Sequence, residues 1–311
     1  MSAAGELRPA VTAADYRLGT PTWCPGCGDY GVLRALQKAA AELQLVPEQT
    51  VVVGGIGCSG KLAYYFRAYA FHGVHGRALP LATGIKLANP RLTVLVAGGD
   101  GDGYGIGLGH LLHAMRRDVD LTYIVMDNHI YGLTKGQYSA TSRKGFRTRS
   151  SPAGSTEEPV HPLELALAAG CGFVAQGFAG DPDQLSRILV SAIRHPGFAL
   201  VNVLSPCVTF NHEDTYDHWQ NALVNLGAAD GVDPDGRPTW DRWGALQRVA
   251  AAQELVRGVI YQRPVDSQAT PCAKAGQVAG DGRDSDLYPA QRPGRGLTLD
   301  EQEEYLARFA G

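Results

Sequence analysis

The chain carries two alternating patterns of apolar positions, one with the spacing of an amphipathic helix and one typical of buried strands. Helical spacing recurs over residues 30–45, 62–71, 80–88, 108–115, 163–169 and 185–193. Short apolar runs predict strands at residues 50–53, 92–97, 121–126 and 198–204. Strands that alternate with helices predict an α/β fold, in which a mostly parallel sheet is covered by helices on both faces.

Two segments lack such a pattern. Residues 136–162 are rich in Ser, Thr, Arg, Gly and Pro, which predicts a long loop of the kind that is usually functional or disordered. Beyond about residue 262 the composition is typical of a linker that leads into one short terminal helix. We therefore expect an α/β domain over residues 1–225 and a largely irregular extension over residues 226–311 that docks on a partner.

Composition and charge narrow the function classes. The 311 residues include 28 Lys and Arg against 31 Asp and Glu, a net charge of −3, which does not favour a general nucleic-acid binder. No apolar run reaches the roughly 18 residues of a membrane span, and residues 1–16 lack the apolar segment of a signal peptide. We expect a cytoplasmic protein without nucleic-acid or membrane partners.

Two polar residues follow strands that are consecutive in the chain. Asp100 comes just after the strand at 92–97, and Asn128 just after the strand at 121–126. A right-handed parallel crossover brings both residues to the carboxyl edge of the sheet, where α/β proteins bind ligands. Two oxygen donors there suit Mg²⁺, which fills its other positions with phosphate and water. The alternative is an ordinary glycine-rich turn with a capping Asp.

The segment before Asp100 is free of acidic residues. Between Lys61 and Gly99 there is no Asp or Glu, whereas the same stretch carries Lys61, Arg67, Arg77, Lys86 and Arg91 together with His72 and His75. Such a region favours the binding of a diphosphate or a carboxylate substrate. A basic surface for a partner subunit is the alternative that charge alone leaves open.

A glycine-rich run from Gly55 to Gly60 follows a predicted strand and matches the dinucleotide-binding fingerprint. That fingerprint also needs an acidic residue about 20 positions further on, where it binds the ribose. The first acidic residue after the run is Asp100, so the sequence does not favour NAD binding.

Cysteines supply a second candidate site. Six cysteines in a chain of this kind indicate metal or redox chemistry before disulfides. Cys24 and Cys27 enclose two residues, and Cys58 and Cys207 each follow a predicted strand, at the same sheet edge as Asp100. A shared four-cysteine site suits either zinc or an iron–sulfur cluster. A thioredoxin-type redox pair is the other possibility for the first two, although no strand precedes them.

Seven motifs occur in order along the chain: WCPGCGDYGVL, GIGCSGK, HGVHGR, ATGIKLANP, GGDGDGYGIG, MDNHIYGLTKGQ and SPCVTFN. Together they resemble the β-subunits of the 2-oxoacid:ferredoxin oxidoreductases, which are thiamine-diphosphate and iron–sulfur enzymes. The resemblance covers about residues 23–219, and several motifs in order are far more specific than any single one. It implies the pyrophosphate-binding type of α/β domain found in thiamine-diphosphate enzymes.

The resemblance also implies roles for the candidate residues. It assigns one [4Fe–4S] cluster to Cys24, Cys27, Cys58 and Cys207, and Mg²⁺ to Asp100, Asn128 and the backbone carbonyl of Ile130. The residues that it places around thiamine diphosphate are Ile56, Gly57, Cys58, Ser59, His75, Gly101, Asp102, Gly132 and Leu133. His75 and Lys135 are the residues expected at the reacting substrate. Pyruvate-selective relatives tend to have Gly where Lys135 stands, and a cation there fits a substrate with a second carboxylate.

The activity that the resemblance implies is the coenzyme A-dependent oxidative decarboxylation of 2-oxoglutarate, with electrons passing through the cluster to ferredoxin. No Cys-x₂-Cys-x₂-Cys-x₃-Cys-Pro run occurs, so we expect one cluster. In this family the carboxylate that activates the cofactor lies on the α-subunit, so we expect an α₂β₂ assembly and no activity from this chain alone. Alternatives are pyruvate or a broad 2-oxoacid range, a non-redox thiamine-diphosphate enzyme, and a zinc-stabilised binding subunit without activity.

A basic cluster lies in the loop at residues 141–155. It consists of Arg143, Lys144, Arg147 and Arg149. Three interpretations stay open from the sequence: the cluster binds the phosphates of coenzyme A, is solvated, or faces the α-subunit.

Overall fold

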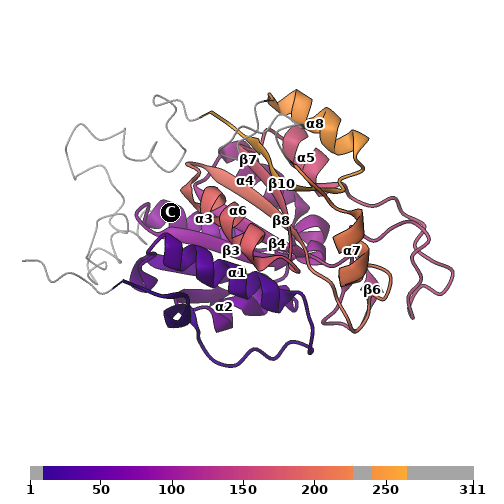
Figure 1. The fold of residues 1–311 in the computed structure, drawn as a ribbon, viewed down its shortest axis with the longest axis horizontal. Helices are drawn as coiled ribbons and strands as arrows, with labels where there is room; N and C mark the ends of the chain where they lie inside the picture. Colours follow the sequence, from indigo (N-terminus) through magenta and orange to yellow (C-terminus); the bar gives the residue numbers. More distant parts are fainter. Residues whose placement is uncertain (1–9, 227–239, 265–311) are drawn as a thin grey trace, which may run out of the picture.

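The computed structural model describes residues 10–226 and 240–264, and in this part of the chain an eight-stranded sheet lies between two layers of helices (Figure 1). The strands are β1 (Thr50–Gly54), β2 (Tyr69–His72), β3 (Thr93–Gly99), β4 (Leu121–Asp127), β5 (Ile130–Tyr131), β6 (Gln137–Tyr138), β7 (Phe173–Phe178), β8 (Phe198–Leu204), β9 (Val224–Asn225) and β10 (Val256–Gln262). The α-helices are α1 (Asp29–Glu42), α2 (Leu62–Tyr65), α3 (Ala78–Ala88), α4 (Leu108–Arg117), α5 (Pro162–Ala168), α6 (Pro182–Arg194), α7 (Tyr216–Ala222) and α8 (Arg242–Ala251).

The sheet is mostly parallel. Its strand order is β2-β1-β3-β4-β8-β7-β10-β9, and the strands from β2 to β7 in this order all pair in parallel. β10 then pairs antiparallel with β7, and β5 and β6 form a separate two-stranded hairpin. The expected α/β class and the mostly parallel sheet are confirmed.

Alternate residues of the strands pack into two separate cores. Val52 and Leu95 join the core beneath α1, α2 and α6, whereas Val51, Val53 and Val96 join the core beneath α3, α4, α5 and α8. Side chains alternate between the faces of a strand, so these continuous apolar runs supply both cores at once. Figure 1 shows α1 and α2 together along one side and α5 beside α8 at one end.

The prediction of one helix over residues 62–71 is wrong. The helix ends at Tyr65, because the backbone turns extended at Phe66 and the Arg67 N–H donates to the Tyr16 carbonyl oxygen at 2.8 Å. Tyr69–His72 is instead the edge strand β2, paired in parallel with β1. The aromatic residues of this segment suit a strand as well as a helix, and the pairing with β1 decides between them.

The second half of the sheet contains strands that the apolar pattern did not predict. β7 lies between the two predicted helices α5 and α6. Within the extension expected to be largely irregular, Arg242–Ala251 is helical and Val256–Gln262 adds to the sheet, so that expectation is wrong for these residues. The division at residues 225 and 226 stays a prediction, and the expected terminal helix lies outside the described residues. In the described part no helix is long and apolar enough to cross a membrane.

His195, at the end of α6, is buried without a hydrogen-bond partner on either ring nitrogen among residues 10–226 and 240–264. Its ring packs on Phe173 at a centroid distance of 5.5 Å. Burial lowers the pKa of His195 to about 4, and the positive charge of Arg263 acts in the same direction. The folded state therefore favours the neutral imidazole.

This burial predicts an acid-sensitive fold. Because the pKa of His195 is lower in the folded chain than its ordinary 6.5, its stabilising contribution is present above pH 6.5 and is lost as the pH falls toward 4. Between about pH 7.5 and pH 5 the loss amounts to roughly 2 kcal/mol of unfolding free energy. Urea unfolding at both pH values should show this loss to be smaller in His195→Leu, but unchanged in His113→Gln, which alters an exposed histidine. Equal losses in both variants would contradict the prediction.

Candidate functional site

Four parallel strands of the sheet end at the same edge. The register pairs Gly54 of β1 with Ala97 of β3, Gly99 of β3 with Met126 of β4, and Asp127 of β4 with Leu204 of β8. The four loops that follow these strands therefore meet, although they are far apart in the sequence. Each loop carries at least one candidate residue from the sequence analysis.

A cavity of about 80 Å³ opens where these loops meet. It is lined by every residue assigned above to thiamine diphosphate or Mg²⁺: Ile56, Gly57, Cys58, Ser59, His75, Asp100, Gly101, Asp102, Asn128, Ile130, Gly132 and Leu133. Gly99, Tyr131 and Thr134 line it as well. The fold thus brings these residues together from separate segments of the chain.

Asp102 holds one wall of this cavity in place. Its buried Oδ1 accepts hydrogen bonds from the backbone N–H of Ile56 at 3.0 Å and of Gly76 at 2.8 Å, and lies 2.7 Å from Nδ1 of His75. A carboxylate partner keeps the proton on Nδ1, which leaves Nε2 of His75 as the nitrogen available to a ligand. Gly55 is required beside it, since a Cβ there would lie 2.0 Å from Oδ2 of Asp102.

Asp100 is a buried carboxyl group beside a second buried carboxyl group, Asp127. The Thr141 hydroxyl lies 2.9 Å from Oδ2 of Asp100 and 2.8 Å from Oδ1 of Asp127, and the Ser139 hydroxyl also bonds Oδ2 of Asp100. Burial and the charge of Asp127 raise the pKa of Asp100 to about 7. A divalent cation at Asp100 would offset this repulsion, so the residues present fit Mg²⁺. The Asn128 side-chain oxygen, which accepts the Ile130 N–H at 3.1 Å, offers a second ligand.

His129, which the sequence analysis missed, supplies positive charge behind this pair. Its Nδ1 lies 3.0 Å from Asp214 and its Nε2 lies 3.5 Å from Asp127. Burial alone lowers the pKa of His129, but Asp127 and Asp214 raise it to about 9, so the ring is charged at neutral pH. No local pattern indicates this role, because Asp214 comes from a loop 85 residues away.

Four cysteines gather beside the cavity. The segment of Cys24 and Cys27 is tied to the Cys207 loop by a 3.0 Å hydrogen bond from the Gly28 N–H to the Pro206 carbonyl oxygen. The Trp23 indole N–H donates to the Cys58 carbonyl oxygen at 2.7 Å. Burial, with smaller effects of Asp29 and of the neighbouring thiols Cys207 and Cys24, raises the pKa of the Cys58 thiol to about 11. All four are free, so the group can offer thiolate ligands to a cationic centre.

The spacing of these sulfurs bears on which centre they suit. Tetrahedral zinc with Zn–S bonds of about 2.3 Å needs sulfurs about 3.8 Å apart. In the described ranges, the one trio of His, Cys, Asp or Glu ligand atoms within 4.8 Å of one another is His161, Glu164 and Glu254, so no three of the cysteine sulfurs there approach that closely. The arrangement is therefore wider than a closed tetrahedral zinc site.

Gly132 separates the cysteine group from the cavity. It lines the cavity, and a Cβ placed on it would lie 3.6 Å from the sulfur of Cys207 and 3.7 Å from that of Cys58. One backbone position therefore stands between the ligand cavity and the thiols. Cys58 itself contributes to both.

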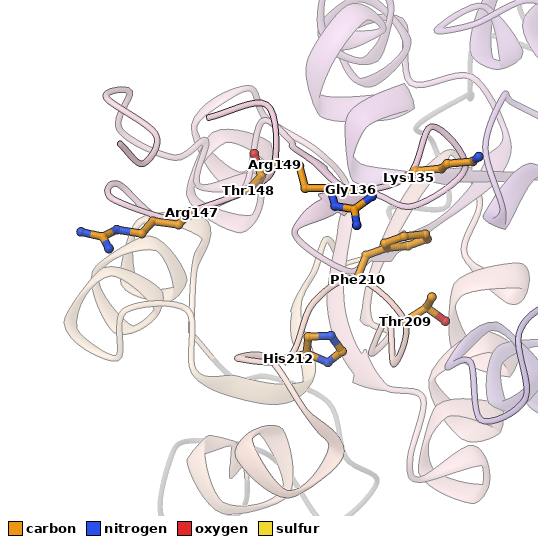
Figure 2. Close-up of a pocket in the computed structure, with 8 residues that line it drawn as sticks. All are labelled: Lys135, Gly136, Arg147, Thr148, Arg149, Thr209, Phe210 and His212. Carbon is orange, nitrogen blue, oxygen red and sulfur yellow. The ribbon is translucent and has the colours of Figure 1, made fainter. Parts of the chain in front are cut away.

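A second, larger cavity of about 590 Å³ lies next to the first and is basic. It is lined by Lys135, Gly136, Arg147, Thr148, Arg149, Thr209, Phe210 and His212 (Figure 2). Lys135 thus belongs to this cavity, whereas the preceding residue Thr134 lines the smaller one. Figure 2 shows the Arg149 guanidinium directed toward Gly136 and Phe210, with Arg147 and Lys135 extending in opposite directions.

The basic loop divides into two pairs of residues. Arg143 lies 2.8 Å from Glu213 and 3.1 Å from Asp214, and Lys144 forms an ion pair with Glu158. Arg147 and Arg149, by contrast, both line the larger cavity. An anion in this cavity would therefore meet Arg149 first, because its guanidinium lies between that of Arg147 and the ammonium group of Lys135 (Figure 2).

Two families of known proteins match parts of the chain. Residues 55–203 match the family "Thiamine pyrophosphate enzyme, C-terminal TPP binding domain". Residues 207–274 match the family that describes the C-terminal part of the beta subunit of pyruvate ferredoxin oxidoreductase. The two matches adjoin near Cys207, at the loop that follows β8.

Individual proteins of known family are similar to this chain over most of its length. Subunit beta of 2-oxoacid:ferredoxin oxidoreductase 1 from Aeropyrum pernix is 45% identical over 248 residues, which cover 78% of each chain. The 2-oxoglutarate oxidoreductase subunit KorB of Mycobacterium tuberculosis is 47% identical over 210 residues, 68% of this chain and 55% of KorB. A chain of the Magnetococcus marinus 2-oxoglutarate:ferredoxin oxidoreductase, solved with 2-oxoglutarate, coenzyme A and succinyl-CoA bound, matches with a TM-score of 0.80 and 38% identity, covering 88% of this chain and 94% of that chain. This chain belongs to the family of 2-oxoacid:ferredoxin oxidoreductase β subunits.

Proposed function

We propose that this β subunit, assembled with an α subunit, catalyses the oxidative decarboxylation of 2-oxoglutarate with coenzyme A. The products are succinyl-CoA and CO₂, and two electrons pass singly to ferredoxin. The observation that carries this proposal is the position of Gly132, which lines the small cavity and lies against the sulfurs of Cys58 and Cys207. A redox centre next to a decarboxylation site is what this reaction needs, and a non-redox enzyme would have no use for the thiols.

The residues present fit both groups that the reaction requires. Asp100, Asn128 and the Ile130 carbonyl would hold Mg²⁺ against a diphosphate, and Cys24, Cys27, Cys58 and Cys207 would hold one [4Fe–4S] cluster. When bound, thiamine diphosphate supplies a nucleophilic carbon and an electron sink for the loss of CO₂, and the cluster supplies a one-electron carrier. Since no three of the cysteine sulfurs in the described ranges lie within 4.8 Å of one another, a closed zinc site is disfavoured.

The chain's own residues bind and orient the reactants. Asp102 fixes the ring of His75 with Nε2 available to the cavity, where its lone pair can accept a hydrogen bond or a proton from a bound ligand. Asp102 also anchors the backbone of Ile56 and Gly76, so the cavity wall is built before any ligand arrives. A preformed wall reduces the reorganisation that the reaction would otherwise need.

Lys135 would select the substrate, and the arginines beside it would bind coenzyme A. Lys135 is exposed and directly follows Thr134, so it lies at the boundary of the two cavities. Its ammonium group would bind the second carboxylate of 2-oxoglutarate, which pyruvate lacks. Arg147 and Arg149 fit the phosphates of coenzyme A, a ligand bound in the Magnetococcus marinus structure. Coenzyme A would then span the larger cavity and present its thiol to the smaller one.

The cluster can be tested by composition. Anaerobically co-purified αβ complex should contain about four iron and four sulfide per β subunit and absorb near ~400 nm. Cys207→Ala should lose most of this iron, whereas Cys171→Ala, at a buried cysteine whose thiol bonds the Phe173 carbonyl oxygen at 3.2 Å, should keep it. The wild-type complex should reduce a dye with 2-oxoglutarate only when coenzyme A is present. Colourless wild-type protein that contains zinc would overturn the proposal.

Substrate selection can be tested at Lys135. Lys135→Ala should raise the KM for 2-oxoglutarate at least about 10-fold, because a lost charge–carboxylate contact is worth roughly 1.4 kcal/mol. The KM for pyruvate should change less than about 2-fold. Lys144→Ala is the matched control, since Lys144 pairs with Glu158 and does not line the cavity. Equal increases for both substrates would remove the specificity role.

Coenzyme A binding can be tested with the two arginines that line the larger cavity. The double variant Arg147→Ala/Arg149→Ala should raise the KM for coenzyme A about 10-fold, with kcat near that of the wild type. The penalty should shrink with dephospho-coenzyme A, which carries less charge. Arg143→Ala, whose guanidinium is engaged by Glu213, serves as the control. An unchanged KM for coenzyme A in the double variant would assign the two arginines to another partner.

A further inference from the structure

A row of buried polar side chains crosses the middle of the sheet. Gln176 of β7 and Asn202 of β8 stand opposite each other in the parallel register, and their side chains are 2% and 1% exposed. Asn202 Nδ2 donates to Gln176 Oε1 at 2.8 Å and to Asp127 Oδ2 at 3.4 Å. Gln176 Nε2 donates to the carbonyl oxygens of Glu254 at 2.6 Å and Val256 at 2.8 Å. The row therefore runs from the end of β4 to the start of β10.

Each amide in this row has a single possible orientation. The carbonyl oxygens of Glu254 and Val256 only accept, so Gln176 must turn its NH₂ group toward them and its oxygen toward Asn202. Asn202 must then donate to Gln176, and its second N–H is left for Asp127. Its oxygen accepts the hydroxyl of the buried Tyr104 at 2.8 Å. Both N–H groups and the oxygen of each amide are thus engaged, and the second N–H of Asn202 orients the side chain of Asp127 through a 3.4 Å contact.

The row ends at Asp127, next to the proposed metal ligand Asp100. Asp127 shares the hydroxyl of Thr141 with Asp100, the residue proposed above to ligate Mg²⁺. Buried partners of this kind orient a metal ligand, and their loss typically weakens metal affinity 10- to 100-fold. The row therefore links the backbone at Glu254 and Val256 to Asp100 through four side chains.

We propose that Gln176 and Asn202 are positioning residues for the metal site, and that they hold Asp127, and through Thr141 the Asp100 carboxylate, in the orientation that binds Mg²⁺. This rests on the proposed function, because it takes Asp100 as a metal ligand. It makes the segment that joins α8 to β10 part of the support of the site, although that segment contributes no residue to the cavity lining. A merely structural role would affect the stability of the sheet but not the affinity for Mg²⁺.

The test compares metal affinity with thermal stability in anaerobic αβ complex. Gln176→Met keeps the size of the side chain and removes its hydrogen bonds, at a residue that forms no hydrogen bond with Asp100 or Asp127. The control is Thr122→Val, which removes a buried hydroxyl from β4 that lies 3.5 Å from the Ala192 carbonyl oxygen, outside the row. The probe is Mg²⁺ titrated at saturating thiamine diphosphate and followed by calorimetry, with the Tm of each variant measured in parallel.

We expect Gln176→Met to raise the apparent Kd for Mg²⁺ about 10-fold, whereas Thr122→Val stays within about 2-fold of the wild type even where the two lower Tm equally. Tyr104→Phe removes a single hydrogen bond from Asn202 and should raise the Kd about 3-fold. If Gln176→Met does not fold, the Kd of Tyr104→Phe for Mg²⁺ tests the proposal instead. Wild-type affinity in the folded row variants would overturn this inference and leave the metal site standing. A wild-type complex that binds no Mg²⁺ would overturn the proposed function as well.

Discussion

The register of the parallel strands is the constraint on which both sites depend. Asp127 pairs with Leu204 across β4 and β8, and this pairing brings Cys207 beside Cys58 and the loop of Asn128. A slip of one residue in β8 would move its loop about 3.3 Å and turn every side chain of the strand to the other face. Because both faces of β8 are packed in apolar cores, such a slip is disfavoured, and the core thereby fixes the geometry of the edge.

The edge of the sheet favours both a cation and an anion, and one ligand can supply both charges. Asp100 and Asp127 are buried together, which calls for a cation, and His75, from the acid-free stretch, lines the cavity beside Asp100 and favours an anion. Lys86 of that stretch lies elsewhere, because it pairs with Asp120 at the start of β4. A divalent cation bound to a diphosphate satisfies both, because each component offsets the charge presented to the other. The ring of His129 lies 3.5 Å from Asp127 and places a positive charge behind that carboxyl group.

The sequence predicted the cavity lining well and the support behind it poorly, for a physical reason. Residues such as Cys58 and Asp100 stand in glycine-rich loops directly after apolar runs, so a local pattern reveals their place at the sheet edge. Gln176 lies in a strand that the apolar pattern did not reveal, and its partners lie 26 and about 80 residues away. The apolar pattern predicts a helix where edge strand β2 lies, since only the pairing with β1 distinguishes the two structures. Contacts of that kind are set by tertiary packing, which no local spacing encodes.

The presence of amides at positions 176 and 202 needs an explanation beyond stability. Apolar side chains of similar size at the centre of a sheet would bury well, and replacing a buried polar group with a well-packed apolar one is often neutral or stabilising. A fully satisfied row of amides offers what apolar residues do not, a fixed direction in which each hydrogen bond points. Asp127 requires such direction, because a carboxyl group that rotates would no longer share Thr141 with Asp100. The polar row is therefore best understood as the means by which a rigid sheet extends its order to a loop residue beyond its edge.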